Sequence, residues 1–435
     1  MSEPMASTEV LVIGAGPAGL AAACAAAESG CKVTVVDEAP WLGGQIWRGQ
    51  SPRPGLPQTR RWFARFQKSG ADFLPGTRVV AAPEPGLLLA ERDNAPLQLR
   101  SKKLILATGA RELFLPFPGW TLPGILGPGG LQALVKNGWP VSGKRVLVAG
   151  SGPLLLAVAA GLREHGARIP IVAEQAPTAK VRSFALQLIA HPSKLWQGLL
   201  LRSRLHDVQY KCGAWPVRAE GNDSLQRVTL TDGQRTWTED CDLFGCGFGL
   251  IPNLELPLLL GCQASEGFIK VDRLQASTVP NVYCAGELTG IGGADCALVE
   301  GQIAGYAATQ ANARAEALLS RRASWHQFRS GLAHAFALRP ELKSLAIADT
   351  IVCRCEDITL GQMRRFSGWR DAKLQSRCGM GACQGRVCGA TAEIILGWTA
   401  ESVRPPILPA RVASLISSPS PQLESKNTPE HLCSI

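Results

Sequence analysis

Residues 8–49 read TEVLVIGAGPAGLAAACAAAESGCKVTVVDEAPWLGGQIWRG, and this stretch decides the fold. The apolar run from Val10 to Ile13 predicts a buried parallel strand, and the run from Lys32 to Val36 predicts a second one. Between the two runs lie a glycine-rich turn and a helix of small residues that ends at Gly30. A strand, a glycine turn, a helix and a second strand in this order predict a Rossmann-type unit.

The turn Gly14-Ala15-Gly16-Pro17-Ala18-Gly19 has the G-x-G-x-x-G spacing of dinucleotide-binding loops. Gly14 allows a tight turn, Gly16 lets the backbone approach a pyrophosphate, and Gly19 lets the helix pack closely on the strand. The first N–H groups of the helix are free to bind phosphate. Asp37 ends the second strand, where its carboxylate can accept hydrogen bonds from an adenosine ribose. These features favour dinucleotide binding over a turn that binds nothing.

The composition of the chain limits its class. Its 435 residues are 46% hydrophobic and 18% charged, which is typical of a globular protein of two or three domains. The net charge of +10 comes without a nucleic-acid motif, so we expect scattered solvated side chains or a basic docking face and no nucleic-acid binding. Neither a signal peptide nor a transmembrane segment is visible, and we expect a cytoplasmic protein. The fourteen cysteines then favour metal binding over disulfides.

A second Rossmann-type unit is predicted further along the chain. Residues 145–149 predict a strand, Gly150 and Gly152 a glycine turn, and residues 169–173 a strand that ends at Glu174. These two glycines and the acid are candidates for a second site, which would bind NAD(P) or another adenine nucleotide.

Two features leave the occupancy of this second site open. Leu155 stands where the pattern has its third glycine, and a side chain there should disturb close packing around a pyrophosphate. Residues 180–206 have helical apolar spacing with basic residues between, broken near Pro192. This pair of helices could cover the second site, dock a partner subunit or pack on its own sheet.

The glycine pair Gly43-Gly44, followed by Gln45, resembles the two-dinucleotide-domain flavoproteins, in which such a pair borders the FAD. The resemblance implies FAD rather than NAD at the first site. It also implies that Thr108 and Gly109, after another buried strand, close the first half of the FAD domain.

In the same family a glycine and an acid, usually aspartate, follow a later strand, and the acid holds the ribityl hydroxyls of FAD. Gly286 and Glu287 occupy this position here, and the helix from Cys296 to Gly305 would direct its N-terminus at the flavin. The candidate FAD-binding residues are Gly14, Gly16, Pro17, Ala18, Gly19, Asp37, Glu38, Gly43, Gly44, Gln45, Thr108, Gly109, Gly286 and Glu287.

Closely spaced cysteines mark the C-terminal part of the chain, in the segments CRCEDIT from residue 353 and RCGMGACQGRVCG from residue 377. Four thiolates from two loops can hold a [2Fe–2S] cluster, and the glycines leave room for backbone N–H groups near sulfur. Structural zinc competes, but it prefers C-x2–4-C spacing. We predict as metal ligands Cys353, Cys355, Cys383 and Cys388, with Cys378 as a spare or alternative ligand.

The two cysteine motifs resemble the bacterioferritin-associated-ferredoxin-like [2Fe–2S] domain. Such a domain behind a two-dinucleotide-domain flavoprotein resembles the α-type subunits of bacterial amine and imino-acid dehydrogenases, including those of opine oxidase, hydrogen cyanide synthase and D-hydroxyproline dehydrogenase. The resemblance implies that a partner flavoprotein subunit oxidises the C–N bond and that this chain relays the electrons. A small iron–sulfur subunit is a further candidate partner. Related α chains of sarcosine oxidase carry NAD where we predict FAD.

Two other functions stay open at this stage. One is a self-sufficient NAD(P)H-dependent FAD/[2Fe–2S] reductase, and the other is an assembly scaffold without electron transfer. No Ser/His/Asp or Cys/His set is apparent, so no catalytic side chain is predicted. We expect an α/β fold with two Rossmann-like domains, the second inserted in the first, and a small C-terminal [2Fe–2S] domain. The expected divisions are 1–115 and 246–312 for the FAD domain, 116–245 for the second nucleotide domain, 313–345 for a linker, 346–410 for the cysteine domain and 411–435 for a disordered tail.

Overall fold

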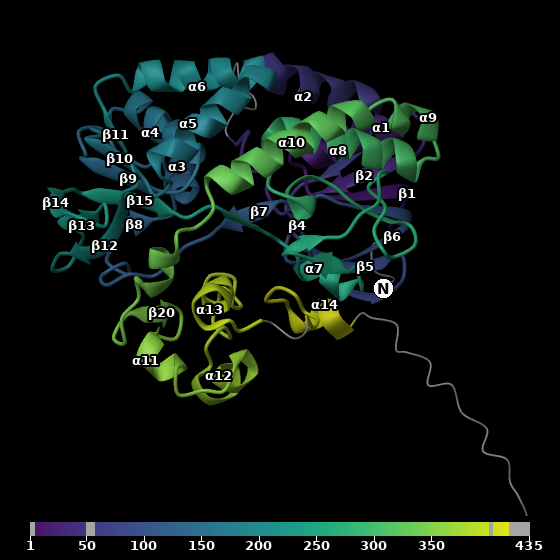
Figure 1. Cartoon of the computed structure of the whole chain (residues 1–435). Coiled ribbons are helices and arrows are strands. Elements are labelled where there is room, and N and C mark those ends of the chain that lie inside the picture. Colours follow the sequence, from purple (N-terminus) through teal and green to yellow (C-terminus); the bar gives the residue numbers. More distant parts are fainter. Residues whose placement is uncertain (1–4, 49–56, 400–402, 417–435) are drawn as a thin grey trace, which may run out of the picture.

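The computed structural model describes residues 5–48, 57–399 and 403–416 and has a mixed α/β fold (Figure 1). Two parts are Rossmann-type units built on sheets with a parallel centre. The cysteine-rich end of the chain forms a smaller third part, which lies below the two units in Figure 1.

The first sheet has seven strands, in the order β3-β2-β1-β6-β5-β4, with β19 paired to the last residues of β6. Val12 is aligned in parallel with Val35 of β2 and Ile105 of β6, so the carboxyl ends of the central strands share one edge. The strands are β1 (Met5–Ile13), β2 (Val33–Val36), β3 (Asp72–Leu74), β4 (Thr77–Glu84), β5 (Leu87–Arg92), β6 (Ala95–Leu106) and β19 (Val282–Cys284).

The alanine-rich helix α1 (Pro17–Ala27) packs between this sheet and α8 (Gly293–Ala308). A Cβ atom on Gly301 would lie 2.1 Å from the carbonyl oxygen of Ala18, and one on Gly305 would lie 2.3 Å from that of Ala22. Only glycine allows such an approach of the two helix backbones. The small residues of α1 are therefore explained by helix packing.

The second sheet is inserted in the chain between β6 and β19, as predicted, and has the order β11-β10-β9-β15-β8. Its strands are β8 (Ile125–Leu126), β9 (Val146–Gly150), β10 (Ile171–Glu174), β11 (Gln209–Cys212) and β15 (Leu243–Gly247). An antiparallel sheet lies beside it, with strands β12 (Trp215–Glu220), β13 (Arg227–Thr231) and β14 (Thr236–Asp240). The chain passes between the two units through β7 (Ala110–Glu112) and β16 (Leu250–Pro252), which pair with each other.

The helices not yet named cover these sheets or build the third part. They are α2 (Pro57–Ser69), α3 (Pro128–Lys136), α4 (Leu154–Glu164), α5 (Thr178–Gln187), α6 (Pro192–Arg204), α7 (Glu255–Leu259), α9 (Asn312–Glu316), α10 (Leu319–Ala335), α11 (Leu360–Met363), α12 (Trp369–Ser376), α13 (Cys388–Leu396) and α14 (Val412–Ile416). Short 3₁₀ helices lie at Leu188–Ala190, Gly286–Thr289 and Pro340–Ser344.

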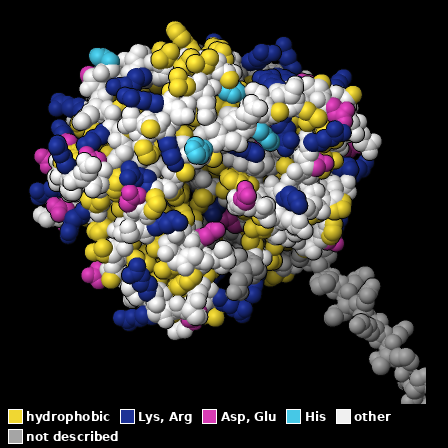
Figure 2. Space-filling view, viewed as in Figure 1, with side chains coloured by type: hydrophobic (Ala, Val, Ile, Leu, Met, Phe, Trp, Pro, Cys, Tyr) yellow, Lys and Arg dark blue, Asp and Glu magenta, His cyan; other side chains and the backbone are white. Residues whose placement is uncertain are grey.

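Helices α5 and α6 form the predicted pair between residues 180 and 206; α5 packs on α10, and α6, at the top of Figure 1, packs on α4. His191 stacks on Trp325 of α10 with ring centres 4.9 Å apart, and Lys194 pairs with Asp295 of α8 at 2.6 Å. The pair therefore packs on helices that follow or belong to the first unit and also on α4 of the second unit. Its outer face leaves apolar side chains in solvent, and these gather at the top of Figure 2. They are Leu186, Ile189, Trp196, Leu199 and Leu200.

The cysteine-rich part, which we call the cysteine module (residues 346–399), contains the strands β20 (Ile351–Cys353) and β21 (Ile358–Thr359) and helices α11 to α13. It docks on the first residues after β7: Thr391 donates to the carbonyl of Phe114 at 3.1 Å, and Trp120 donates to that of Ile351 at 2.6 Å. Its position relative to the two Rossmann-type units is therefore held by direct hydrogen bonds.

The start of the predicted disordered tail is instead a helix, α14. Ser414 is buried and donates to Glu91 of β5 at 2.9 Å, and the backbone N–H of Arg411 donates to the same carboxylate. The prediction of disorder from residue 411 was wrong for this segment because a buried acid on β5 supplies its anchor. Residues 417–435 lie outside the described part of the chain. Among the described helices, none combines the length and the apolar character needed to cross a membrane.

Candidate functional site

The predicted FAD-binding segments meet at the carboxyl edge of the first sheet. The N–H of Gly43 donates to the carbonyl of Ala15 at 2.8 Å, and a Cβ on Gly44 would lie 2.9 Å from the Cα of Gly16. Thr108 follows β6, which lies next to β1, and Gly286 follows β19, which lies next to β6. Segments that are far apart in the sequence thus surround one glycine turn.

The three glycines of this turn have different surroundings. Gly14 has φ +103°, and a Cβ there would lie 2.2 Å from the carbonyl oxygen of Ala107. A Cβ on Gly19 would lie 1.8 Å from the carbonyl oxygen of Gly14. By contrast, among the described residues no atom other than those of its chain neighbours lies within 4 Å of the Cβ position of Gly16. Gly14 and Gly19 are therefore required by packing, whereas Gly16 faces an open cradle at the start of α1 that suits a pyrophosphate.

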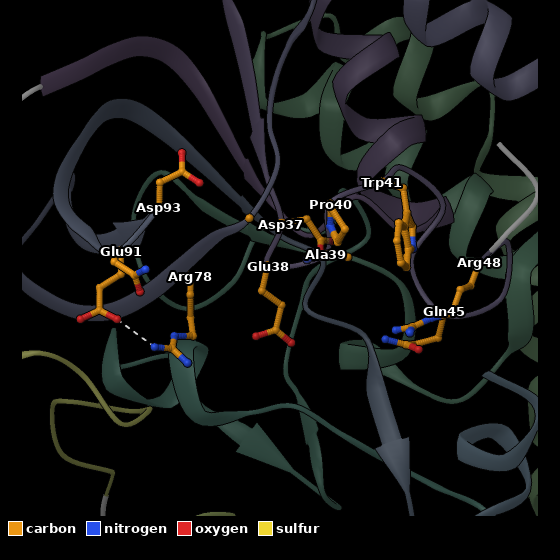
Figure 3. Close-up of a pocket in the computed structure, with 12 residues that line it drawn as sticks. Asp37, Glu38, Ala39, Pro40, Trp41, Gln45, Arg48, Arg78, Glu91 and Asp93 are labelled. Carbon is orange, nitrogen blue, oxygen red and sulfur yellow. Dashed lines mark hydrogen bonds and ion pairs between the residues drawn. The ribbon is translucent and has the colours of Figure 1, made fainter. Parts of the chain in front are cut away.

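A pocket of about 510 Å³ lies over the end of β2, beside the segment that carries Gln45 (Figure 3). Asp37 lies on its wall, with one carboxylate oxygen 2.6 Å from the N–H of Ala15 and the other 2.8 Å from that of Ala39. Burial raises the pKa of Asp37, although the two N–H groups oppose the shift. Each oxygen keeps a further lone pair for a ribose hydroxyl.

Figure 3 shows how the remaining walls of this pocket are charged. Glu38 extends its carboxylate into the space between Arg78, which pairs with Glu91 at 2.8 Å, and the group of Gln45 and Arg48. The pocket therefore offers acceptors and donors for the sugar and base of an adenosine.

Glu287 supports a flavin at the same edge. Its Oε1 accepts the N–H of Gly293 at the start of α8 at 3.1 Å, while its Oε2 is buried with no hydrogen-bond partner among the described residues. Burial raises the pKa of Glu287 to about 7. A buried acceptor without a donor is costly, and the ribityl hydroxyls of FAD are donors of the required kind. The residues of this site therefore fit FAD.

Glu300 is a functional candidate that the sequence reasoning missed. It is completely buried in α8, and it accepts from the N–H of Gly286 at 3.0 Å and from Thr289 at 2.8 Å. His326 Nε2 lies 2.8 Å from the same carboxylate, and Arg329 lies 3.5 Å away. An acid within the apolar and small-residue run from Cys296 to Gly301 of α8 was the available signal, but its partners in α10 could not be read from the sequence.

The second glycine turn repeats part of this arrangement. Glu174 accepts the N–H of Gly152 at 2.7 Å and that of Ala176 at 2.8 Å, as Asp37 does at the first turn. A Cβ on Gly150 would lie 1.7 Å from the carbonyl oxygen of Gly247, whereas the part of the chain that the structure describes places no atom beyond its chain neighbours within 4 Å of the Cβ position of Gly152. The glycine cradle itself is open.

Glu174, the acid of this second site, is not accessible to a ligand. Glu174 and Gln175 are both 0% exposed, and burial raises the pKa of Glu174 to about 7. The segment 336–339, which follows α10, is held here because Gln175 donates to Ser151 at 3.0 Å and to the carbonyl of Ala337 at 3.1 Å. A ribose cannot reach Glu174 in this conformation, so the residues do not fit an adenine nucleotide bound in the usual manner.

The cysteine module brings the predicted ligands together with one change. The sulfur atoms of Cys353, Cys378 and Cys388 lie within 4.8 Å of one another, and all three residues are buried. The pKa of Cys353 is held far below its ordinary value by the thiols of Cys378 and Cys388, while contact with Cys353 raises the pKa of the other two. Cys378 is therefore a central member of the group, and of its two predicted roles the alternative ligand fits this position, whereas the spare does not.

The other two predicted ligands, Cys355 and Cys383, lie beside each other at the rim of this group. The backbone N–H of Cys383 lowers the pKa of Cys355, but burial and the thiol of Cys383 outweigh this effect and raise that pKa, which indicates that the two residues are neighbours. A Cβ on Gly381 would lie 2.3 Å from the Cβ of Cys355, which shows why glycine is needed for this approach. The site therefore contains three convergent thiols and an adjacent pair from which a fourth ligand can come. This donor set fits an iron–sulfur cluster.

The fold and the first site together define a flavin-dependent oxidoreductase of the two-dinucleotide-domain class, with a cysteine cluster near its C-terminus. The family described as pyridine nucleotide-disulphide oxidoreductase matches residues 8–316. The chain belongs to this family.

Similar proteins extend over most of the chain. Hydrogen cyanide synthase subunit HcnB of Pseudomonas protegens is 32% identical over 88% of this chain and 90% of its own length. An opine oxidase subunit from Rhizobium meliloti is 33% identical over 95% of this chain and 100% of its own length. Among solved structures, L-proline dehydrogenase from P. horikoshii shares the fold with a TM-score of 0.65 and 19% identity, over 95% of this chain and 80% of its own.

Proposed function

We propose that this chain is the electron-transferring flavoprotein and iron–sulfur subunit of a hetero-oligomeric dehydrogenase that acts on amino or imino acids of the hydroxyproline, opine or glycine type. The observation that carries the proposal is the cysteine group, docked beside a flavin-type site in a single chain. Its similarity to proteins named as subunits of hydrogen cyanide synthase and opine oxidase supports the same assignment. In this proposal a partner flavin subunit oxidises the substrate and supplies the electrons.

The two cofactors of the proposal have separate places. FAD would lie with its pyrophosphate at Gly16, its adenosine ribose at Asp37 and its ribityl chain at Glu287. A [2Fe–2S] cluster would use Cys353, Cys378, Cys388 and one of the pair Cys355 and Cys383. When bound, the flavin can take up electron pairs and the cluster can pass electrons singly. The chain's own residues supply binding, orientation and charge.

The pair of helices α5 and α6 supports a contact with a partner protein. Residues 178–206 contain no aspartate or glutamate but, besides the paired Lys194 and Arg204, three further basic residues, Lys180, Arg182 and Arg202. The same helices expose apolar side chains, Trp196 among them. Figure 2 shows apolar and basic side chains near one another at the top of the molecule. A large exposed apolar patch in a soluble domain is typical of a protein interface. A partner surface with apolar and acidic side chains would complement it.

The proposal is tested by an anaerobic visible spectrum of the purified full chain, with iron and flavin assays. We expect flavin and cluster bands that do not change with NADH, bleach with dithionite, and are not bleached by amino or imino acids in the absence of a partner. Substrate-driven bleaching by the chain alone would contradict the relay role. A purified chain without iron would contradict the iron–sulfur assignment.

A self-sufficient NAD(P)H-dependent reductase is the second candidate, because Gly152 faces an open cradle like that of Gly16. The complete burial of Glu174 argues against this second candidate. Bleaching of the flavin by NADH within the mixing time would favour this second function and would mean that residues 336–339 move.

A further inference from the structure

Three charged side chains meet where the cysteine module touches the crossover between the two Rossmann-type units. Arg111 of β7 pairs with Glu255 at the start of α7, with Nη1 and Oε1 2.9 Å apart. Arg386, in the loop before α13, places its Nε 3.8 Å from the same Glu255 oxygen. Arg111 Nε also donates to the backbone carbonyl of Arg386 at 3.1 Å. One carboxylate thus links two guanidinium groups from different parts of the chain.

Arg386 connects these three charged side chains to the cysteine loop. Arg386 Nη1 donates to the carbonyl of Cys383 at 3.4 Å, and Nη2 donates to the carbonyl of Ile407 at 2.7 Å. Arg386 therefore holds the backbone of the loop between Cys378 and Cys388, in which the candidate ligand Cys383 lies.

Arg111 is also connected to the flavin site by hydrogen bonds. Arg111 Nη1 donates to Asn253 Oδ1 at 2.8 Å. The side-chain amide of Asn253 donates to the carbonyl of Thr108 at 2.9 Å, and the hydroxyl of Thr108 donates to the carbonyl of Asn253 at 2.9 Å. The backbone N–H of Asn253 donates to the carbonyl of Gly109 at 3.0 Å. An unbroken series of contacts therefore runs from the turn predicted to border FAD to the cysteine loop.

The charges of the group do not cancel. Arginine stays protonated in proteins, so two guanidinium groups and one carboxylate leave an excess of one positive charge. The three side chains are only 22 to 27% exposed, which reduces solvent screening of that charge. A cluster that gains one electron becomes more negative by one unit, and a nearby positive charge stabilises the reduced form.

We propose that Arg111, Glu255 and Arg386 form a charged clamp, which holds the cysteine loop against the flavin-site turn and raises the reduction potential of the cluster. The inference rests on the proposed presence of an iron–sulfur cluster. The three side chains are positioning residues, since none of them occupies a candidate ligand position. The clamp has two separable consequences, one electrostatic and one mechanical.

The electrostatic consequence is tested by a potentiometric titration of the full chain, with the reduced cluster detected by electron paramagnetic resonance. Arg111→Gln and Arg386→Gln should each lower the midpoint potential, changing the ratio of reduced to oxidised cluster at a fixed potential about tenfold, equal to about 59 mV for one electron. Glu255→Gln should shift the potential in the opposite direction. Arg65→Gln removes a matched half-buried pair with Glu28, remote from the module, and should leave the potential unchanged.

The mechanical consequence is tested by limited proteolysis of the segment between α10 and β20. Arg386→Lys keeps the charge but loses the fork that reaches both Cys383 and Ile407. It should keep the wild-type potential and yet be cleaved several-fold faster. Because proteolysis needs no iron, it also tests the clamp in cluster-free protein.

The outcomes separate this inference from the proposed function. Shifts of the same sign for Arg111→Gln and Glu255→Gln, or none beyond that of Arg65→Gln, would overturn the electrostatic role while the cluster remained. An unchanged cleavage rate in Arg386→Lys would overturn the mechanical role. A wild-type chain that never holds iron would instead overturn the proposed function and the electrostatic role with it.

Discussion

Replacement of Gly16 by alanine is the most direct test of the first nucleotide site. Gly16 has φ −73° and ψ −176°, which alanine adopts readily, and no described atom beyond its chain neighbours lies within 4 Å of its Cβ position. The free energy of unfolding of the flavin-free protein should therefore change by less than about 0.5 kcal/mol. The added methyl group would instead stand in the pyrophosphate cradle. Losing one hydrogen bond to a charged phosphate, worth about 1.5 to 3 kcal/mol, should raise the Kd for FAD roughly 10- to 150-fold.

The assay is a titration of flavin-free protein with FAD, followed by flavin fluorescence, beside urea unfolding of each variant. Gly198→Ala in α6 is the matched control, because it makes the same chemical change where no described atom outside the backbone of its own helix lies within 4 Å, and it should bind FAD like the wild type. Gly19→Ala should behave differently, since its Cβ would lie 1.8 Å from a carbonyl oxygen, and should cost about 3 kcal/mol of stability. Wild-type FAD affinity in Gly16→Ala, or loss of FAD through unfolding of that variant, would refute the reasoning.

Three further predictions follow from the buried groups. The pKa of Glu287 is raised from 4.5 to about 7, so the folded flavin-free protein holds the extra proton between these values and loses roughly 3 kcal/mol of stability as the pH rises through them. Glu287→Gln should remove that part of the slope in urea unfolding at pH 5 and pH 8, and an unchanged slope would contradict it. Cys378→Ser should lose iron as completely as Cys388→Ser in an iron assay, whereas retention of most of the iron would return Cys378 to a spare role. Gln175→Ala should lower the free energy of unfolding by about 1 to 3 kcal/mol, because it leaves buried polar groups of segment 336–339 unpaired; a stability equal to that of the wild type would show that this segment is not held by Gln175.

The sequence alone determined the local units of this protein. The turn from Gly14 to Gly19 was readable because its backbone geometry and the packing of α1 depend on residues within a few positions of one another. The inserted second unit was readable for the same reason, since its strands and glycine turn carry their own pattern. The cysteine spacing identified a metal-type site, because the ligands are chemically distinctive and occur in two short segments.

Only the tertiary structure decided which distant groups share a site. Cys378 joins Cys353 and Cys388 because α12 ends beside β20, and no spacing rule ranks it above Cys355. Glu174 occupies the position of the ribose-binding acid in the pattern, yet it is fully buried. Segment 336–339, more than 160 residues further along the chain, packs there and is hydrogen-bonded to Gln175. Arg111 finds its partners at similarly large separations. Steric requirements within a turn or helix constrain residues that are close in the sequence, so their pattern is visible there. Burial and charge pairing depend on how the whole chain packs, and a single sequence does not show which distant side chains come into contact.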